Sequence, residues 1–211
     1  MTTLRITNPA DGSALAEVAS DDAASVAAKF DRARRAQPSW AATPLVERIV
    51  AMRGFRAAVE RELDTLARTL TQEVGKPLQQ SKNELNGFLG RIDFFLAAVE
   101  KTVAPETVLA DGGMTERIDH DPLGVVANVS AWNYPYFVGG NVFVPALLTG
   151  NAVLYKPSEF ATLTGQHIER LLHGAGIPRD VFITVVGAGD VGAALLEQPV
   201  DGVFFTGSVA T

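Results

Sequence analysis

From Pro122 onward, short apolar runs alternate with segments of helical pattern. The apolar runs span residues 123–129, 152–156, 182–186 and 203–206, and the helical patterns between them span residues 135–149, 161–173 and 190–198. Continuous apolar runs are typical of strands that are buried on both faces of a sheet. Strands connected in this way by helices pair in parallel. Residues 122–211 therefore predict an α/β fold with a doubly wound, Rossmann-like parallel sheet.

This sheet is predicted to be incomplete at its C-terminal end. The last apolar run leads to Gly207-Ser208, and no helical pattern follows it. Four parallel strands without that cover leave an apolar edge and an apolar face open. We therefore expect the sequence to be the N-terminal part of a longer protein.

The first 121 residues carry helical patterns between two predicted hairpins. In residues 1–105, a hairpin turning at Asp11-Gly12 precedes helical patterns over residues 20–37, 43–75 and 85–99, the first of them ended by Pro38. In residues 106–121, two extended segments flank the turn Asp111-Gly112-Gly113. We interpret this second hairpin as an arm or a connector.

Composition excludes several classes of function. The net charge is −6 and the Lys and Arg residues are scattered, which argues against binding to nucleic acid or to an anionic membrane surface. The sequence has no cysteine, so it carries no disulfide, no thiol nucleophile and no cysteine-ligated metal. The three histidines lack metal-ligand spacing, and we predict no metal site. Without a signal peptide or an apolar run of about 18 residues, we expect a cytoplasmic protein.

Four loops are predicted to meet at one edge of the sheet. Ligands of an open parallel sheet bind outside the carboxyl ends of its strands. The segments that follow the predicted strands are Ser130–Pro135, Lys156–Glu159, Gly187–Gly192 and Thr206–Ser208. Together they supply an amide, an ammonium group, a carboxylate, hydroxyls and glycine backbone, a mixture that suits a nucleotide beside a reacting carbonyl.

Each loop also has a structural interpretation. Gly187–Gly192 spells G-x-G-x-x-G, but it follows the third strand, and Asp201 lies only nine residues beyond it. Close helix packing, or contact with another part of a nucleotide, is therefore favoured over a pyrophosphate cradle. Lys156 and Glu159 form either a solvated turn or a ribose and phosphate contact. The Asn133 side chain either holds its own backbone turn or donates to a developing oxyanion.

The loops, in this order and spacing, resemble the N-terminal half of the aldehyde dehydrogenase superfamily. The segments that carry the resemblance are Pro122–Val126, Ala131–Pro135, Pro145–Leu147 with Gly150-Asn151, Lys156–Glu159 and Phe205–Ser208. The segment Thr71–Pro77 also resembles the end of a helix in that family. The resemblance implies NAD(P)-dependent oxidation of an aldehyde to a carboxylic acid through a thiohemiacetal.

The resemblance also implies roles for individual residues. It makes Asn133 the oxyanion donor, Tyr134 a residue that lines the substrate site, and residues 1–105 the helical part of the cofactor-binding domain. The implied cofactor contacts are Ser130, Ala131, Trp132, Asn133, Lys156, Ser158, Glu159, Gly189, Asp190, Gly192, Ala193, Phe205, Thr206, Gly207 and Ser208. NAD is favoured over NADP because Glu159 would repel a 2′-phosphate, although Lys156 partly offsets that repulsion.

The family's nucleophilic cysteine and water-activating glutamate have no counterpart here, so we expect the chain alone to be inactive. Residues 106–121 resemble part of the family's oligomerisation arm, which implies a homodimer or homotetramer. Two alternative functions are a coenzyme A-acylating aldehyde dehydrogenase and a non-catalytic nucleotide-binding module.

Overall fold

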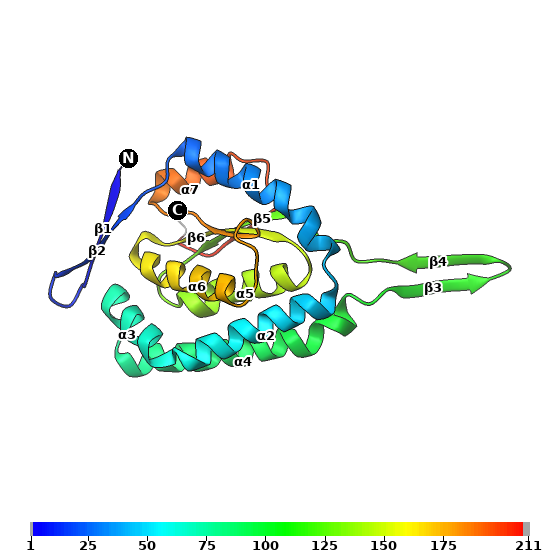
Figure 1. The fold of residues 1–211 in the computed structure, drawn as a ribbon, viewed down its shortest axis with the longest axis horizontal. Helices are drawn as coiled ribbons and strands as arrows, with labels where there is room; N and C mark the ends of the chain where they lie inside the picture. The colour runs from blue at the N-terminus through cyan, green and yellow to red at the C-terminus, as the bar shows by residue number, and fades with distance from the viewer. Residues whose placement is uncertain (1, 209–211) are drawn as a thin grey trace.

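A four-stranded parallel sheet lies at the centre of the fold, as the computed structural model, which describes residues 2–208, shows (Figure 1). Its strands are β5 (Val125–Ser130), β6 (Ala152–Pro157), β7 (Phe182–Thr184) and β8 (Gly202–Phe205). Their spatial order is β7-β6-β5-β8, and every neighbouring pair is parallel. The chain adds strands on one side of β5 and then crosses to the other side to form β8. The predicted α/β class and doubly wound parallel sheet are confirmed.

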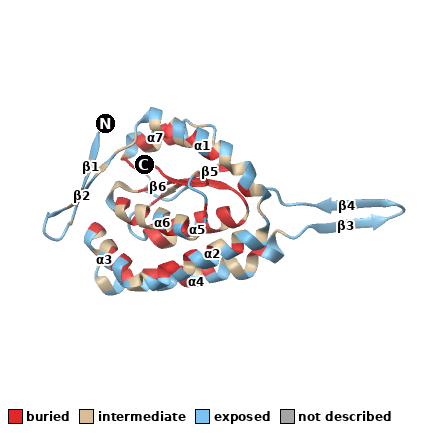
Figure 2. Cartoon of the chain, viewed as in Figure 1, coloured by how far each residue is buried: buried red, intermediate tan, exposed pale blue. Residues whose placement is uncertain are grey.

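Helices cover both faces of this sheet. One face packs against α1 (Ala23–Ala42) and α7 (Gly189–Leu196), and the other packs against α5 (Pro135–Leu148) and α6 (Thr162–Gly174). Beyond α5 and α6 lies an outer layer made of α2 (Leu45–Arg61), α3 (Leu63–Val74) and α4 (Leu78–Thr102) (Figure 1). Figure 2 shows the buried residues concentrated where these layers meet.

Alternation along the strands divides the core in two. Val125 and Ala127 of β5 join the cluster beneath α1 and α7, whereas Val126 joins the cluster beneath α5 and α6. All three side chains are at most 1% exposed, as the continuous apolar run predicts. β8 differs, because Val203 is 50% exposed and Phe205 is 47% exposed. The open apolar edge and face expected at this end of the sheet are therefore observed.

Two antiparallel hairpins project from the layered body (Figure 1). The strands β1 (Thr3–Thr7) and β2 (Ala14–Ala19) pair near the start of the chain, and β3 (Glu106–Asp111) pairs with β4 (Met114–Ile118). Every residue of β3 and β4 is exposed. Both hairpins were predicted at these positions.

The first helical prediction was wrong in its end point, because Pro38 does not stop the helix. α1 continues through Pro38 to Ala42. Trp40 lies beyond the proline, is 5% exposed and donates a hydrogen bond from Nε1 to the Leu147 carbonyl at 3.0 Å. The burial and the hydrogen bond of Trp40 stabilise the last turn of α1 and so offset the loss of the backbone hydrogen bond that a proline causes in a helix interior.

The prediction of one continuous helix over residues 43–75 was also wrong. The structure divides it at Glu62, where φ of −100° and ψ of 9° separate α2 from α3. The Glu62 carboxylate accepts from the Arg170 guanidinium of α6 at 2.6 Å. Spacings of three and four residues persist on both sides of Glu62, so the apolar pattern alone does not reveal the break. The structure also places η1 (Glu159–Ala161), a short 3-10 helix, before α6.

None of the helices in residues 2–208 combines the length and apolar character needed to cross a bilayer.

Replacing Phe143 by alanine tests the aromatic packing beneath the sheet. Phe143 is fully buried, and its ring packs edge-on against the rings of Phe55, Tyr155 and Phe182. We expect Phe143→Ala to lower the free energy of unfolding by about 3–5 kcal/mol, because it removes a large apolar side chain and leaves a cavity. Urea denaturation measures this, with Phe94→Ala, whose side chain is 57% exposed, as the control. Equal losses in the two variants would contradict the prediction.

Candidate active site

A cleft of about 650 Å³ opens at the carboxyl edge of the sheet. It lies where the loops after β5, β6 and β8 meet the first turns of α7. β5 stands between β6 and β8, and the strand order reverses there, so this cleft lies at the topological switch point where parallel sheets bind ligands. Its volume falls within the range of small-molecule sites.

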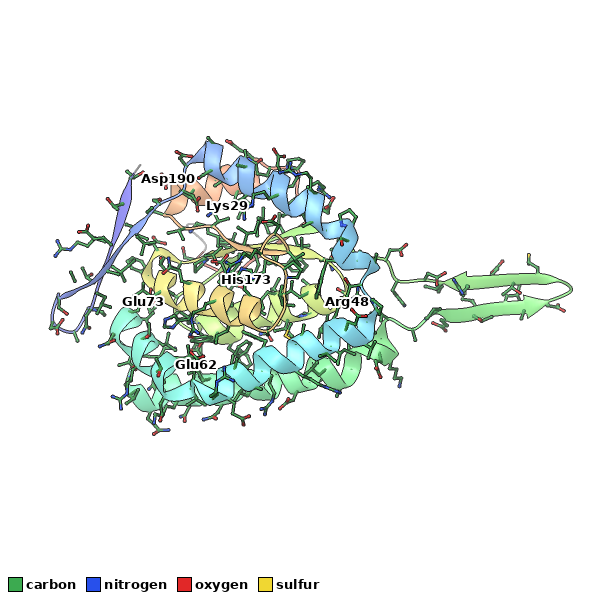
Figure 3. The ribbon with its side chains drawn as sticks, viewed as in Figure 1. Lys29, Arg48, Glu62, Glu73, His173 and Asp190 are labelled. Carbon is green, nitrogen blue, oxygen red and sulfur yellow. The ribbon has the colours of Figure 1, made fainter. Side chains whose placement is uncertain are left out.

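The structure brings almost all the predicted cofactor contacts together in this cleft. The lining residues that were predicted are Ser130, Ala131, Trp132, Asn133, Lys156, Ser158, Glu159, Gly189, Gly192, Ala193, Phe205, Thr206, Gly207 and Ser208. Asp190 is not among the lining residues; it is exposed in the first turn of α7 (Figure 3). Tyr134 lines a neighbouring hollow of about 350 Å³ together with Trp132 and Asn133.

Three apolar lining residues were missed by the sequence analysis. Val129, Phe160 and Leu196 also line the cleft. Phe160 is 59% exposed and Leu196 is 51% exposed, which places two large apolar side chains at the rim. Their one sequence signal is position, since Phe160 follows Glu159 directly and Leu196 lies one turn beyond Gly192 on α7.

Asn133 presents its side-chain amide without a partner. The residue is exposed in the loop between β5 and α5, and its side chain makes no hydrogen bond to any part of the chain that the structure describes. Its backbone carbonyl, in contrast, accepts from the Lys76 ammonium at 2.5 Å. The loop is therefore held through its backbone, and the interpretation in which the Asn133 side chain holds its own turn does not apply.

Lys156 is a buried cation at the end of β6. The residue is 4% exposed, and Nζ donates to the Gly187 carbonyl at 2.9 Å and to the Pro157 carbonyl at 3.3 Å. Within residues 2–208, no carboxylate lies within ion-pair distance of this ammonium. Burial lowers the pKa of Lys156, while Glu159 and Asp190 oppose that shift. A buried ammonium held only by carbonyl dipoles favours oxygen-rich ligands, and the solvated-turn interpretation of Lys156 is wrong.

Glu159 lies in the turn directly after β6. Its carboxylate accepts from the Ser158 hydroxyl at 3.2 Å, and the same hydroxyl oxygen accepts from the Phe160 backbone N–H at 3.3 Å. The following helix, α6, is fixed by Glu73 of α3 (Figure 3), whose carboxylate accepts from the Leu163 and Thr164 backbone N–H groups. This contact connects the turn that carries Glu159 to the helical layer.

Two glycines of Gly187–Gly192 allow close packing around α7. A Cβ at Gly187 would lie 2.3 Å from Cγ2 of Val191 and 2.9 Å from the Ser20 hydroxyl oxygen. A Cβ at Gly192 would lie 3.3 Å from Cε of Lys156. Gly187 therefore lets α7 approach the sheet, and Gly192 lets α7 pass close to the Lys156 side chain. These contacts support the close-packing interpretation of the motif.

Within residues 2–208, the acidic and imidazole side chains form no cluster of three or more that could hold a metal ion.

Comparison with known proteins defines the family. The family model described as the aldehyde dehydrogenase family matches residues 1–211. The N-succinylglutamate 5-semialdehyde dehydrogenase of Chromobacterium violaceum is 39% identical over 206 residues, which cover 97% of this chain and 42% of that protein. The chain therefore belongs to the aldehyde dehydrogenase family, and it spans less than half the length of this curated relative.

Solved structures agree with this assignment. A putative aldehyde dehydrogenase from Burkholderia cenocepacia superposes with a TM-score of 0.94 at 31% identity, covering 99% of this chain and 44% of that one. An indole-3-acetaldehyde dehydrogenase from P. syringae, solved in complex with NAD+ and IAA, gives a TM-score of 0.90 at 34% identity, with coverages of 95% and 41%.

Replacing Glu73 by glutamine tests the anchor of α6. Burial raises the pKa of Glu73 from 4.5 to about 7, and the hydrogen bonds from Thr164 and Leu163 oppose that shift. Between pH 4.5 and about 7, the Glu73 carboxyl is therefore protonated in the folded chain and ionised in the unfolded chain. The stabilisation that comes from this proton is fully present below about pH 4.5 and is lost as the pH rises through about 7. We expect the wild type to lose unfolding free energy relative to Glu73→Gln between about pH 5 and about pH 7.

Urea denaturation of both chains at a series of pH values measures this difference. Parallel pH profiles for the wild type and Glu73→Gln would contradict the assignment of a raised pKa to Glu73.

Proposed function

We propose that this chain supplies the NAD(P)-binding cleft and the oxyanion donor of an aldehyde dehydrogenase that oxidises an aldehyde to a carboxylic acid. One juxtaposition carries the proposal. The Asn133 amide, which has no hydrogen-bond partner among the described residues, and the buried ammonium of Lys156 line the same cleft at the switch point of the sheet. The first group suits a developing oxyanion, and the second suits the oxygens of a nucleotide.

The residues of the cleft fit a dinucleotide. In our proposal, Lys156 donates to ribose hydroxyls, Glu159 accepts from the ribose diol, and the backbone of Gly207 and Ser208 approaches the pyrophosphate. The absence of a carboxylate beside the Lys156 ammonium, among the described residues, leaves this cation available to an oxygen ligand. Gly189 supports the fit, since a Cβ there would meet no atom within 4 Å, which leaves open space at the first turn of α7.

Catalysis also requires groups that these 211 residues do not contain. When bound, NAD(P) would supply the hydride acceptor for oxidation of the aldehyde. The sequence has no cysteine, so we propose that the attacking thiolate and the water-activating glutamate come from residues outside this chain. The Asn133 amide would donate to the oxygen that becomes negative when the thiolate attacks the aldehyde. The relative from Chromobacterium violaceum makes N-succinylglutamate 5-semialdehyde the first substrate to assay.

The β3–β4 hairpin is proposed as an oligomerisation arm. It exposes the apolar side chains of Val108, Met114 and Ile118, which are 56%, 55% and 48% exposed. Apolar side chains on a projecting hairpin are protected from water by a second subunit. The proposed assembly is a homodimer or a homotetramer.

Replacing Asn133 by alanine tests the catalytic part of the proposal. In the full-length dehydrogenase that we propose contains this chain, we expect Asn133→Ala to lower kcat at least about a hundredfold, because it removes a donor worth about 2.7–4 kcal/mol to the transition state. Affinity for the cofactor should change little. Steady-state kinetics measures both, with Asn83→Ala on the surface of α4 as the control. Unchanged turnover in Asn133→Ala would remove this residue from the oxyanion role.

Replacing Glu159 by glutamine tests the choice of cofactor. The substitution removes a negative charge that would repel the 2′-phosphate of NADP. We therefore expect the ratio of kcat/KM for NADP to that for NAD to rise by about tenfold, which corresponds to about 1.4 kcal/mol. Glu197→Gln, at the exposed end of α7, is the matched control. A ratio that is unaltered in Glu159→Gln would contradict the proposed ribose contact.

A further inference from the structure

An ion pair between the partly buried Lys76 and the buried Glu84 holds the loop that carries Asn133. The Lys76 ammonium lies 2.5 Å from the Glu84 carboxylate and 2.5 Å from the Asn133 carbonyl oxygen. It also lies 4.2 Å from the centre of the Tyr134 ring. Lys76 follows the C-terminal end of α3, whereas Asn133 and Tyr134 are more than fifty residues away along the chain. One ammonium therefore contacts two consecutive residues of the loop.

Glu84 holds the other end of the same loop. Its side chain is fully buried, and Oε1 accepts from the Tyr136 backbone N–H at 2.9 Å and from the Phe137 N–H at 3.4 Å. These N–H groups belong to the first turn of α5, where an isolated helix has unsatisfied donors and a positive end of its dipole. Glu84 thus caps α5 from α4 while its second oxygen holds Lys76.

The two contacts fix the segment between them. Asn133 is held at its carbonyl by Lys76, and α5 is held three residues later by Glu84. The backbone of residues 133–136 therefore has few conformations left, and the Asn133 side chain projects from a fixed point. A hydrogen-bond donor stabilises an oxyanion only when it is placed in advance, and a misplacement of about 1 Å costs about a hundredfold in rate.

We propose that Lys76 and Glu84 are positioning residues that aim the Asn133 amide into the cleft. This inference rests on the proposed function, because the Lys76–Glu84 pair affects catalysis only if Asn133 is the oxyanion donor. Neither residue lines the cofactor cleft, although Lys76 lines the neighbouring hollow together with Trp132, Asn133 and Tyr134. Their contacts with the loop at Asn133 and Tyr136 are the route by which they position the amide. Cofactor affinity should accordingly be insensitive to them.

Kinetics of the full-length dehydrogenase test the catalytic consequence. We expect Lys76→Met, which retains a long apolar stem, to lower kcat/KM for the aldehyde between about tenfold and about a hundredfold and to leave KM for NAD unchanged. Lys82→Met is the matched control, because Lys82 lies on α4 and pairs with Asp64 at 2.7 Å away from the loop. If Lys76→Met keeps the turnover of Lys82→Met while Asn133→Ala is impaired, the positioning role is wrong and the proposed function stands.

Tryptophan fluorescence of the 211-residue chain tests the positioning itself, independently of any activity. The chain has two tryptophans; Trp40 is 5% exposed, so acrylamide quenching reports on Trp132, which is 50% exposed and precedes Asn133. We expect Lys76→Cys to increase the quenching constant of Trp132 and to lower its anisotropy. Since the chain has no other cysteine, treatment of the unfolded variant with 2-bromoethylamine, followed by refolding, converts the introduced thiol specifically into a lysine analogue.

Restoration of the wild-type quenching and anisotropy by this treatment would support the proposal, with iodoacetamide, which adds a neutral group, as the control reagent. Removing the Lys76 charge leaves Glu84 buried without a cation and lowers stability, so circular dichroism must show every sample to be folded. Wild-type quenching in folded Lys76→Cys, or equal recovery with both reagents, would overturn the proposal.

Discussion

Parallel pairing of β5 with β6 on one side and β8 on the other determines where this protein can bind a ligand. The pairing aligns the carboxyl ends of the three strands, and this brings Lys156, at the end of β6, to the same cleft as Asn133 and Gly207 of the following loops. Hydrogen bonding continues past the strands, since the Thr206 N–H donates to the Val129 carbonyl at 3.0 Å. Residues more than seventy positions apart in sequence therefore share one cleft. The pairing of the strands determines where this cleft lies, and the loop residues determine what it can bind.

Buried ionisable side chains then fix the loops that the sheet brings together. Glu73 accepts from the start of α6, Glu84 accepts from the start of α5, and Lys156 donates to the Gly187 carbonyl ahead of α7. Each of these side chains is desolvated, and each is matched by dipoles or by a counter-charge from a distant part of the chain. Desolvation raises the pKa of Glu84, and the Lys76 ammonium opposes that shift. Geometry at this edge depends on long-range polar contacts as much as on apolar packing.

The sequence predicts the sheet and most of the cleft, because both depend on local order along the chain. Apolar runs identify the strands, and a parallel topology places the carboxyl ends of all of them at one edge of the sheet. This was enough to predict that Lys156, Glu159 and Gly192 share one site. Contacts between distant segments are not encoded in that way. The packing of Trp40 against Leu147 carries α1 past Pro38, and the Lys76–Glu84 pair was not anticipated because periodicity records only which helix face is apolar. Asp190 was predicted as a cofactor contact from the family resemblance, but it is exposed in the first turn of α7 and does not line the cleft.

The two edges of the sheet differ in how far they are closed. At β7, side chains occupy the outward backbone groups: Glu169 accepts from the Thr184 N–H, Lys29 (Figure 3) donates to the Thr184 carbonyl, and Asp21 accepts from the Val186 N–H just beyond the strand. These side chains occupy backbone groups that a further strand would need for pairing. At β8, by contrast, Val203 and Phe205 remain about half exposed. A strand that extended this sheet would therefore pair beside β8, the edge next to the loop of Phe205–Ser208 that lines the cleft.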